Sequence, residues 1–206
     1  VIYNASNNSA IETIDVTSSQ VSGSGSLYIT INPGSDLADS TSYYVQIAAT
    51  AFDDSSSNSY AGISDTTSLS FTTADETAPT FSSAATNTAG TKVILTYNEA
   101  LSSTTAATSA FSVTSGGSSN SVTDVAISGS TVELTLATTV KNDETVTFTY
   151  SDPSSGNDSN AIQDSSGNDA ISLSSTSVTN NSTVAGTAPT FSSAATNTAG
   201  TKVILT

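Results

Sequence analysis

Residues 131–150 read TVELTLATTVKNDETVTFTY. At its start Val132, Leu134 and Leu136 alternate with polar residues, and the same alternation of apolar and polar residues recurs over 146–150. A period of two places the apolar side chains of a strand on one face, so both ends of the stretch are predicted to be strands with one buried face. The stretch therefore indicates an all-β fold.

The same pattern extends outward from this stretch. Short alternating runs are separated by clusters of Ser, Gly, Asn and Asp, and no segment keeps the apolar spacing of a helix. Besides 131–136 and 145–150, the sequence predicts strands at residues 80–84, 92–97, 110–114, 122–127 and 171–178. Seven strands with one buried face each predict a β-sandwich. Its predicted core consists of Phe81, Val93, Leu95, Val132, Leu134, Phe148 and Tyr150.

The N-terminal segment follows this plan from the third strand onward. Its predicted strands are residues 1–3, 11–16, 27–31, 43–48 and 69–73, which align in order with the last five strands of the following segment. Within this alignment, residues 27–31 correspond to the strand at 131–136. The sequence therefore predicts a related sandwich that lacks its first two strands.

A repeat of 20 residues sets the domain organisation. TAPTFSSAATNTAGTKVILT occupies residues 77–96 and returns unchanged at 187–206, a period of 110 residues. A period of this length matches one small domain and not a solenoid unit. We expect tandem β-sandwich domains at 1–76 and 77–186, and the first two strands of a further repeat at 187–206.

Two explanations remain for the mismatched ends of this array. In the first, the chain is a window cut at both ends from a longer array, so that its neighbours complete both partial domains. In the second, residues 187–206 of one copy complete the N-terminal domain of another, head to tail. The first is favoured because residues 187–206 are identical to the start of the 77–186 domain and should prefer that type of groove.

The composition excludes several classes of partner. The chain has 42 serines and 36 threonines, a net charge of −15, and only Lys92, Lys141 and Lys202 as basic residues. Three scattered lysines form no basic patch, so nucleic acid and anionic membrane surfaces are excluded as direct partners. No apolar run reaches the ~18 residues of a membrane helix, so we expect no direct membrane insertion.

Longer motifs resemble two bacterial families. The segment 31–73, with INPGSDLADSTSYYVQI, YAGISD and SFTT, resembles bacterial Ig-like domains of the Big_5 type. TAPTFSSAATNTAGTKVILTYNEAL, followed by FTYSDPSSGND and AIQDSSGND, resembles the SWM repeat, which is named after a giant swimming-associated surface protein. The resemblance implies tandem immunoglobulin-like (Ig-like) β-sandwich modules of very large secreted or surface-anchored bacterial proteins, and it implies no catalytic residues.

The residue inventory also argues against an enzyme. Without His or Cys, neither Ser/His nor Cys/His nucleophile systems can be built, and zinc has no imidazole or thiolate ligand. Paired carboxylates remain as candidates for glycoside cleavage, but they lie in Ser-rich loops without a Trp platform for sugar. We therefore expect no catalytic site, and Ca²⁺ is the one candidate cofactor.

Calcium is the best-founded chemical hypothesis, because it prefers several oxygen ligands from carboxylates and amides. The loop 151–170 supplies the candidate ligands Asp152, Asp158, Asp164, Asn168 and Asp169, together with Asn157. The N-terminal domain offers Asp53, Asp54, Asn58 and Asp65. The alternative, which we favour, is that these residues cap tight turns, since no EF-hand spacing is present.

The acids near the first domain boundary are a weaker candidate. Asp75, Glu76 and Glu99 could form an interdomain cation site, but the second boundary, 182–187, contains no acid. A cation site that stiffens the boundary between two domains should recur at every boundary. We therefore favour the interpretation that these three acids are solvent-exposed charges without a bound ion.

These observations lead to two expected functions. The first is a structural or adhesive extracellular module of a giant surface or filament-forming bacterial protein, in contact with neighbouring domains and other copies of itself. The alternative is a calcium-dependent adhesin module that binds another ligand or carbohydrate. Tyr60 is the only obvious loop aromatic, so binding through exposed rings is predicted to be weak.

Overall fold

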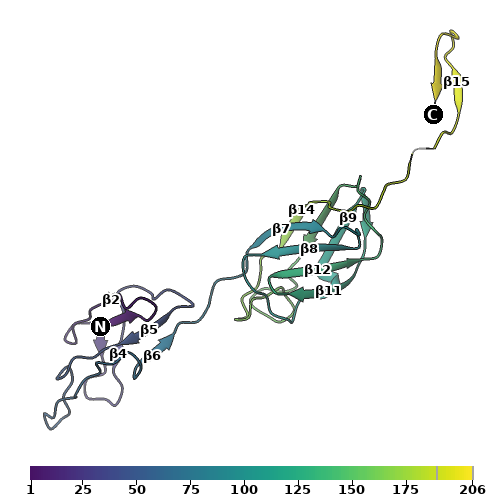
Figure 1. Cartoon of the computed structure of the whole chain (residues 1–206). Coiled ribbons are helices and arrows are strands. Elements are labelled where there is room, and N and C mark those ends of the chain that lie inside the picture. The colour runs from purple at the N-terminus through teal and green to yellow at the C-terminus, as the bar shows by residue number, and fades with distance from the viewer. Residues whose placement is uncertain (189, 206) are drawn as a thin grey trace. The chain divides into compact units, whose positions relative to one another are not determined.

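The computed structural model describes residues 1–188 and 190–205 and consists of antiparallel strands with one 3₁₀ turn, Thr108–Ala110. The chain divides into two units, Val1–Thr77 and Ala78–Thr206, each of which is described by itself (Figure 1). The fold class predicted from the sequence, all-β, is confirmed.

Unit 2 contains two four-stranded sheets. The first has the order β11-β12-β8-β7, with β7 at Phe81–Thr86, β8 at Lys92–Tyr97, β11 at Val122–Ser128 and β12 at Thr131–Leu136. The second has the order β10-β9-β13-β14, with β9 at Phe111–Ser115, β10 at Ser118–Asn120, β13 at Val146–Tyr150 and β14 at Leu173–Val178.

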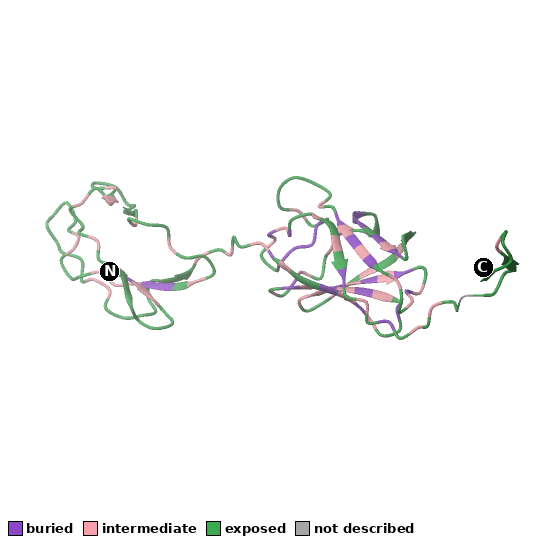
Figure 2. Ribbon diagram, turned by 90° about the horizontal axis from the view of Figure 1, so that it is seen from above, coloured by how far each residue is buried: buried purple, intermediate pink, exposed green. Residues whose placement is uncertain are grey.

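The core of unit 2 is formed by the apolar face of each sheet. Val93, Leu95, Val132 and Leu134 of the first sheet are fully buried, and Phe148 of the second sheet belongs to the same cluster. Figure 2 shows the alternation of buried and half-buried residues along these strands. Burial of each such side chain contributes about 1.5–3 kcal/mol, so this layer supplies most of the stability of the unit.

The predicted strands of unit 2 are confirmed with small shifts at their ends. The predicted ranges 92–97 and 131–136 coincide with β8 and β12. β10 was not predicted, because SSN has no apolar residue to mark it; it follows Gly116 and Gly117, whose positive φ values form the turn after β9. Phe81 is half-buried at the rim of the core, while the other six predicted core residues are buried.

Unit 1 has one four-stranded sheet and one very short one. The larger sheet has the order β2-β1-β5-β6, with β1 at Ile2–Asn4, β2 at Ala10–Glu12, β5 at Ser42–Val45 and β6 at Ser70–Thr72. The smaller sheet pairs β3 at Val21–Ser22 with β4 at Thr30–Ile31. Ile2, Tyr43 and Tyr44 are the buried hydrophobic residues of this unit, so its core is far smaller than that of unit 2.

Two strand predictions for unit 1 were wrong in extent. Of the predicted strand 27–31 only residues 30–31 form β4, and of the predicted strand 11–16 only residues 11–12 belong to β2. The side chain of Leu27 is 98% exposed and that of Tyr28 is 81% exposed. In unit 2 the matching strand β12 is paired on both sides, with β11 and β8, whereas β4 is paired with β3 alone. A strand without a neighbour has no ladder to fix its extended backbone.

The C-terminal repeat forms a hairpin of its own. β15 at Ala194–Thr196 pairs with β16 at Val203–Leu205. Its register is that of β7 and β8, since Ala194 faces Leu205 as Ala84 faces Leu95. Residues 189 and 206 of the predicted 187–206 segment lie outside the described residues.

Candidate functional site

The acidic loop 151–170 joins β13 to β14 and is organised around Asp164. Its Oδ1 accepts hydrogen bonds from the backbone N–H of Ser166 (2.8 Å) and of Asn168 (2.9 Å). Its Oδ2 accepts a third from Nδ2 of Asn168 at 2.8 Å. Only 2% of Asp164 is exposed, so the carboxylate closes a buried turn.

These contacts also set the charge of Asp164. Burial acts to raise its pKa, but hydrogen bonds from Asn168, Ser166 and Gly167 together outweigh burial and hold the pKa below its ordinary value. Hydrogen bonds that favour the charged form act in this direction. Asp164 is therefore ionised at neutral pH.

The other predicted ligands also accept hydrogen bonds from within the loop. Asp169 accepts from Nε2 of Gln163 at 2.7 Å and from the backbone N–H of Asp158 at 3.0 Å. Asp158 in turn accepts from the backbone N–H of Asn160 at 2.7 Å. Asp152 accepts from the backbone N–H of Ser154 at 3.3 Å. The loop thus ties Asp158 to Asp169 and Asp164 to Asn168, while the carboxylate of Asp152 caps its own turn.

The matching loop of unit 1 has the same local geometry. Asp54 accepts from the backbone N–H groups of Ser56 and Asn58 and from Nδ2 of Asn58, each at 2.8 Å. Ser57 takes the positive φ that Gly167 takes in unit 2. The shared pattern of Asp followed four residues later by Asn is therefore a turn motif, which supports the capping interpretation in both units.

One further acid of unit 2 lies near the loop. Carboxylate oxygens of Glu99 and Asp164 lie within 4.8 Å of each other, and the neighbouring Leu101 forms a β-bridge with Asp164. In the sequence Glu99 is only an acid near the first domain boundary, with no link to Asp164. The fold brings them together across 65 positions of the chain, and no local pattern could have revealed that.

The hydrogen bonds within the loop lead to a testable prediction about calcium binding. Because its carboxylates already accept hydrogen bonds, we expect thermal melts of the chain in EDTA and in millimolar CaCl₂ to coincide. A ligand that binds only the native state raises the melting temperature by mass action. A fall of several degrees in EDTA that is absent from Asp164→Asn would instead establish a calcium site at this loop.

The same contacts give a pH dependence with a defined sign. The folded-state pKa of Asp164 lies below its unfolded value of about 3.9, so its ionised form stabilises the fold above that pH. This contribution is lost as the pH falls through the folded-state pKa. We expect the urea midpoint of unit 2 to fall less steeply below about pH 4 in Asp164→Asn than in the parent chain. Asp124→Asn, at an exposed aspartate on β11, is the control and should retain the parent slope.

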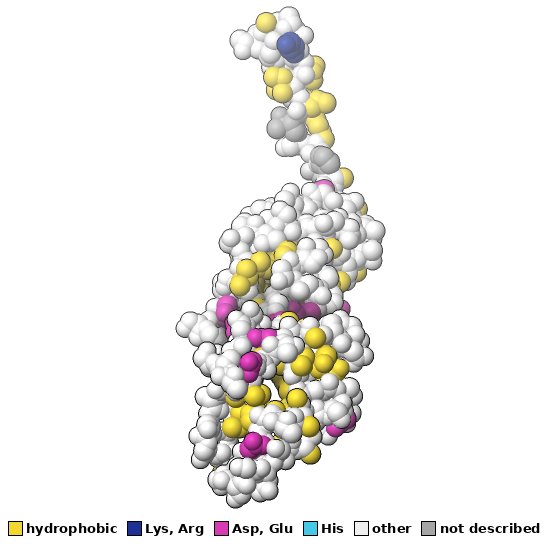
Figure 3. Space-filling view, turned by 90° about the vertical axis from the view of Figure 1, so that its left-hand side faces the viewer, with side chains coloured by type: hydrophobic (Ala, Val, Ile, Leu, Met, Phe, Trp, Pro, Cys, Tyr) yellow, Lys and Arg dark blue, Asp and Glu magenta, His cyan; other side chains and the backbone are white. Residues whose placement is uncertain are grey.

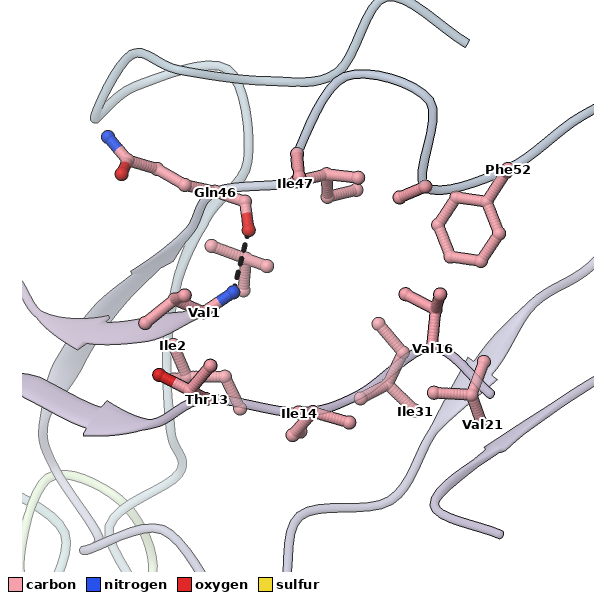
Figure 4. A pocket seen from close by; sticks show the side chains of 13 residues that line it. Val1, Ile2, Thr13, Ile14, Val16, Val21, Ile31, Gln46, Ile47 and Phe52 are labelled. Atoms are coloured by element: carbon pink, nitrogen blue, oxygen red, sulfur yellow. Dashed lines mark hydrogen bonds between the residues drawn. The ribbon is translucent and has the colours of Figure 1, made fainter. Parts of the chain in front are cut away.

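Unit 1 contains a different kind of feature, an apolar pocket of about 170 Å³. Figure 4 shows Val16, Val21 and Ile31 across the pocket from Ile47 and Phe52. The exposed aromatic residues of the unit are Tyr28, Tyr60 and Phe71. Phe71 lies on β6, but Tyr28 lies in a loop, so the expectation that Tyr60 is the only obvious loop aromatic was wrong. Tyr28 was assigned to the predicted strand 27–31, but it lies outside β4.

No helix within the described residues is long and apolar enough to cross a membrane. Comparison with curated proteins gives no match. Two solved structures share 22% sequence identity over 59% of this chain. One is the S-layer protein rSbsC(31-844), with a TM-score of 0.40, and the other is the N-terminal part of the bacterial S-layer protein SbsC, with a TM-score of 0.41. The matched regions are 15% and 26% of those proteins, so the chain corresponds to a minor part of either.

Family comparison gives one match for each part of the chain. Residues 2–73 match the bacterial Ig-like domain of the Big_5 type. Residues 74–155 match the SWM repeat, a flagellar system-associated repeat, and neither family is enzymatic. The chain therefore contains a bacterial Ig-like domain at residues 2–73, followed by an SWM repeat at residues 74–155.

Proposed function

We propose that this chain is a structural and adhesive repeat module of a giant bacterial protein outside the cell, either on the surface or in a filament. One observation carries the proposal: a 20-residue segment recurs unchanged after 110 residues and folds into the same hairpin register at both places. Tandem copies of a small β-domain give a protein length and spacing, which is what a surface spacer needs.

The composition supports an extracellular role for such an array. The net charge of −15 keeps neighbouring modules soluble and mutually repelling. The two families, a bacterial Ig-like domain and an SWM repeat, are compatible with a protein of this kind. Stability here rests on the sandwich core, without disulfides, because the sequence contains no cysteine.

Antibody labelling of cells that produce the protein tests this proposal. Antibodies raised against the 206-residue chain should label intact, unpermeabilised cells as strongly as permeabilised ones. An antibody to a cytoplasmic protein, which should label only permeabilised cells, is the control. Labelling that appears only after permeabilisation would contradict a place outside the cell.

The second candidate is a calcium-dependent module that binds carbohydrate or another ligand. It is favoured by the proximity of the Glu99 and Asp164 carboxylates and by the exposed rings of Tyr28 and Tyr60. Binding of the chain to immobilised glycans in CaCl₂, lost in EDTA and in Tyr60→Ala, would favour this function. If the immobilised glycans retain the same amount of the chain with and without EDTA, the result would favour the structural function over the calcium-dependent one.

A further inference from the structure

The first strand of the sandwich in unit 2 runs parallel to the segment that follows its last strand. Beyond β14 the chain continues as residues 179–186, and Thr179 forms a parallel β-bridge with Ala85 of β7. The backbone N–H of Thr86 donates to the carbonyl of Thr179, and the N–H of Thr179 donates to the carbonyl of Ala84, each at 2.9 Å. The segment therefore joins the two sheets, since β14 belongs to the second and β7 to the first (Figure 1).

Side chains add to these backbone contacts. Thr86 is only 3% exposed, and its Oγ1 accepts a hydrogen bond from the N–H of Asn181 at 2.8 Å and donates one to Oδ1 of Asn180 at 3.1 Å. Further along, the N–H and Oγ1 of Thr183 both donate to the carbonyl of Thr88, at 2.9 and 3.1 Å. Each partner is satisfied by the other segment, so separating the two segments leaves polar groups unpaired in a buried place.

Residues 84–88 and 179–183 together form a clamp, which the loop between β12 and β13 also holds. Nδ2 of Asn180 donates to the carbonyls of Lys141 and Glu144 in this loop, at 2.7 and 2.8 Å. The same amide group accepts the hydrogen bond from β7 through its oxygen atom. Asn180 therefore ties the last segment of the sandwich to β7 on one side and to the loop on the other.

The parallel arrangement decides how tension acts on the clamp. The chain enters the sandwich before β7, at residues 78–80, and leaves it after the clamp, at residues 184–186. Because the paired segments run in the same direction, the entry and the exit lie at opposite ends of the clamp. Tension along the chain therefore slides one segment past the other. Since a hydrogen bond weakens steeply once it is misaligned, sliding breaks the bonds of the clamp together, whereas peeling breaks them one at a time.

The clamp consists of uncharged groups, namely peptide groups, threonine hydroxyls and an asparagine amide. White atoms, which are the backbone and the side chains that are neither charged nor hydrophobic, also predominate on the face of the chain in Figure 3. Salt screens interactions between charges and has little effect on hydrogen bonds between neutral groups. The clamp therefore keeps its strength in dilute and in saline surroundings.

We propose that unit 2 carries tension along the array and that the clamp is the element that resists it. The proposal rests on the structural role proposed above, because a spacer between two attachment points is pulled from both ends. The rate of unfolding determines how long a module survives under tension, and that rate depends on the contacts that break before the transition state. Because the clamp joins the two ends of the sandwich, the sandwich cannot be pulled apart until the clamp breaks.

Single-molecule force spectroscopy of the full chain, held by its two ends, tests the clamp. Unfolding of the sandwich, residues 81–186, releases about 35 nm of chain, which identifies the event. Asn180→Ala should raise the unfolding rate at a given force by about tenfold or more, because it removes contacts on both sides of the last segment. The matched control is Asn120→Ala, which removes hydrogen bonds to Ser115 and Thr138 outside the clamp. It should lower the urea midpoint but change the rate under force by less than about twofold.

A change in the direction of pulling tests the geometry without altering any contact of the clamp. Ala89→Cys gives the chain a single thiol, in an exposed turn at the exit end of the clamp. Pulling between this thiol and the C-terminal end peels residues 179–183 from β7 bond by bond, so the unfolding rate at the same force should be about a hundredfold higher.

Two results would overturn the proposal. One is an equal unfolding rate in the two pulling directions. The other is an equal rise of the rate under force in Asn180→Ala and Asn120→Ala at equal loss of stability in urea, which would show that the whole core resists the force. Neither result affects the labelling of intact cells, which tests the location of the protein separately.

Discussion

Phe148→Ala should lower the free energy of unfolding of unit 2 by about 3–5 kcal/mol, the largest effect expected for a single substitution. The Phe148 side chain is 1% exposed, and its ring centroid lies 5.6 Å from that of Phe81 on the facing sheet. Truncation leaves a cavity between two sheets that cannot close without moving whole strands. Because small domains are stable by only about 5–15 kcal/mol, this loss brings unit 2 close to unfolding.

Urea denaturation followed by circular dichroism measures this loss. Thr147→Ala is the matched control, since its side chain lies on the opposite face of β13 and should change stability by no more than about 0.5 kcal/mol. An unchanged midpoint in Phe148→Ala, with a large loss in Thr147→Ala, would place the strand one residue out of register.

Gly90→Ala should destabilise unit 2 by about 2–4 kcal/mol. Gly90 lies in the turn before β8 with φ of +67°, where a Cβ atom would stand 2.2 Å from the carbonyl oxygen of Val140. The backbone around it is fixed, because the N–H of Val140 donates a hydrogen bond to the carbonyl of Gly90 at 2.8 Å. The substitution therefore combines left-handed backbone strain with a clash that only movement of main chain can relieve.

The repeat supplies an internal control for this prediction. Gly200 has the same φ of +67° in the identical hairpin sequence, but a Cβ atom there meets no atom within 4 Å. Gly200→Ala should cost only the backbone strain of about 1 kcal/mol, confined to the β15–β16 hairpin, and leave the melting transition of the sandwich formed by β7 to β14 in place. If both substitutions lowered the stability of this sandwich equally, Gly90 would not lie in tight contact with the backbone of Val140.

The comparison of the two units shows what the sequence could predict. β8 and β12 were located to the residue, because each has a strict alternation of apolar and polar side chains and buries one face against a complete partner sheet. The segment 27–31 has an equally clear pattern, yet only two of its residues form a strand. The alternation of apolar and polar residues indicates which face of a strand can be buried. A strand forms only where a neighbouring strand supplies the partners for its backbone hydrogen bonds.

In the acidic loop 151–170, too, the sequence predicts some contacts and not others. The roles of Asp164 and Asn168 in a tight turn follow from the local pattern of Asp followed four residues later by Asn, which also occurs at Asp54 and Asn58. The approach of Glu99 to Asp164 depends on how two distant segments of the sandwich meet. Local turn chemistry is therefore visible in the sequence, whereas the non-local grouping of charges required the folded structure.

Electron microscopy of the native material, labelled with gold-conjugated antibodies to this chain, tests the central claim most directly. A structural module of a long extracellular array should place gold particles along extended threads or a continuous coat outside the cell. Gold particles confined to the cell interior, or bound to isolated compact particles, would contradict the account.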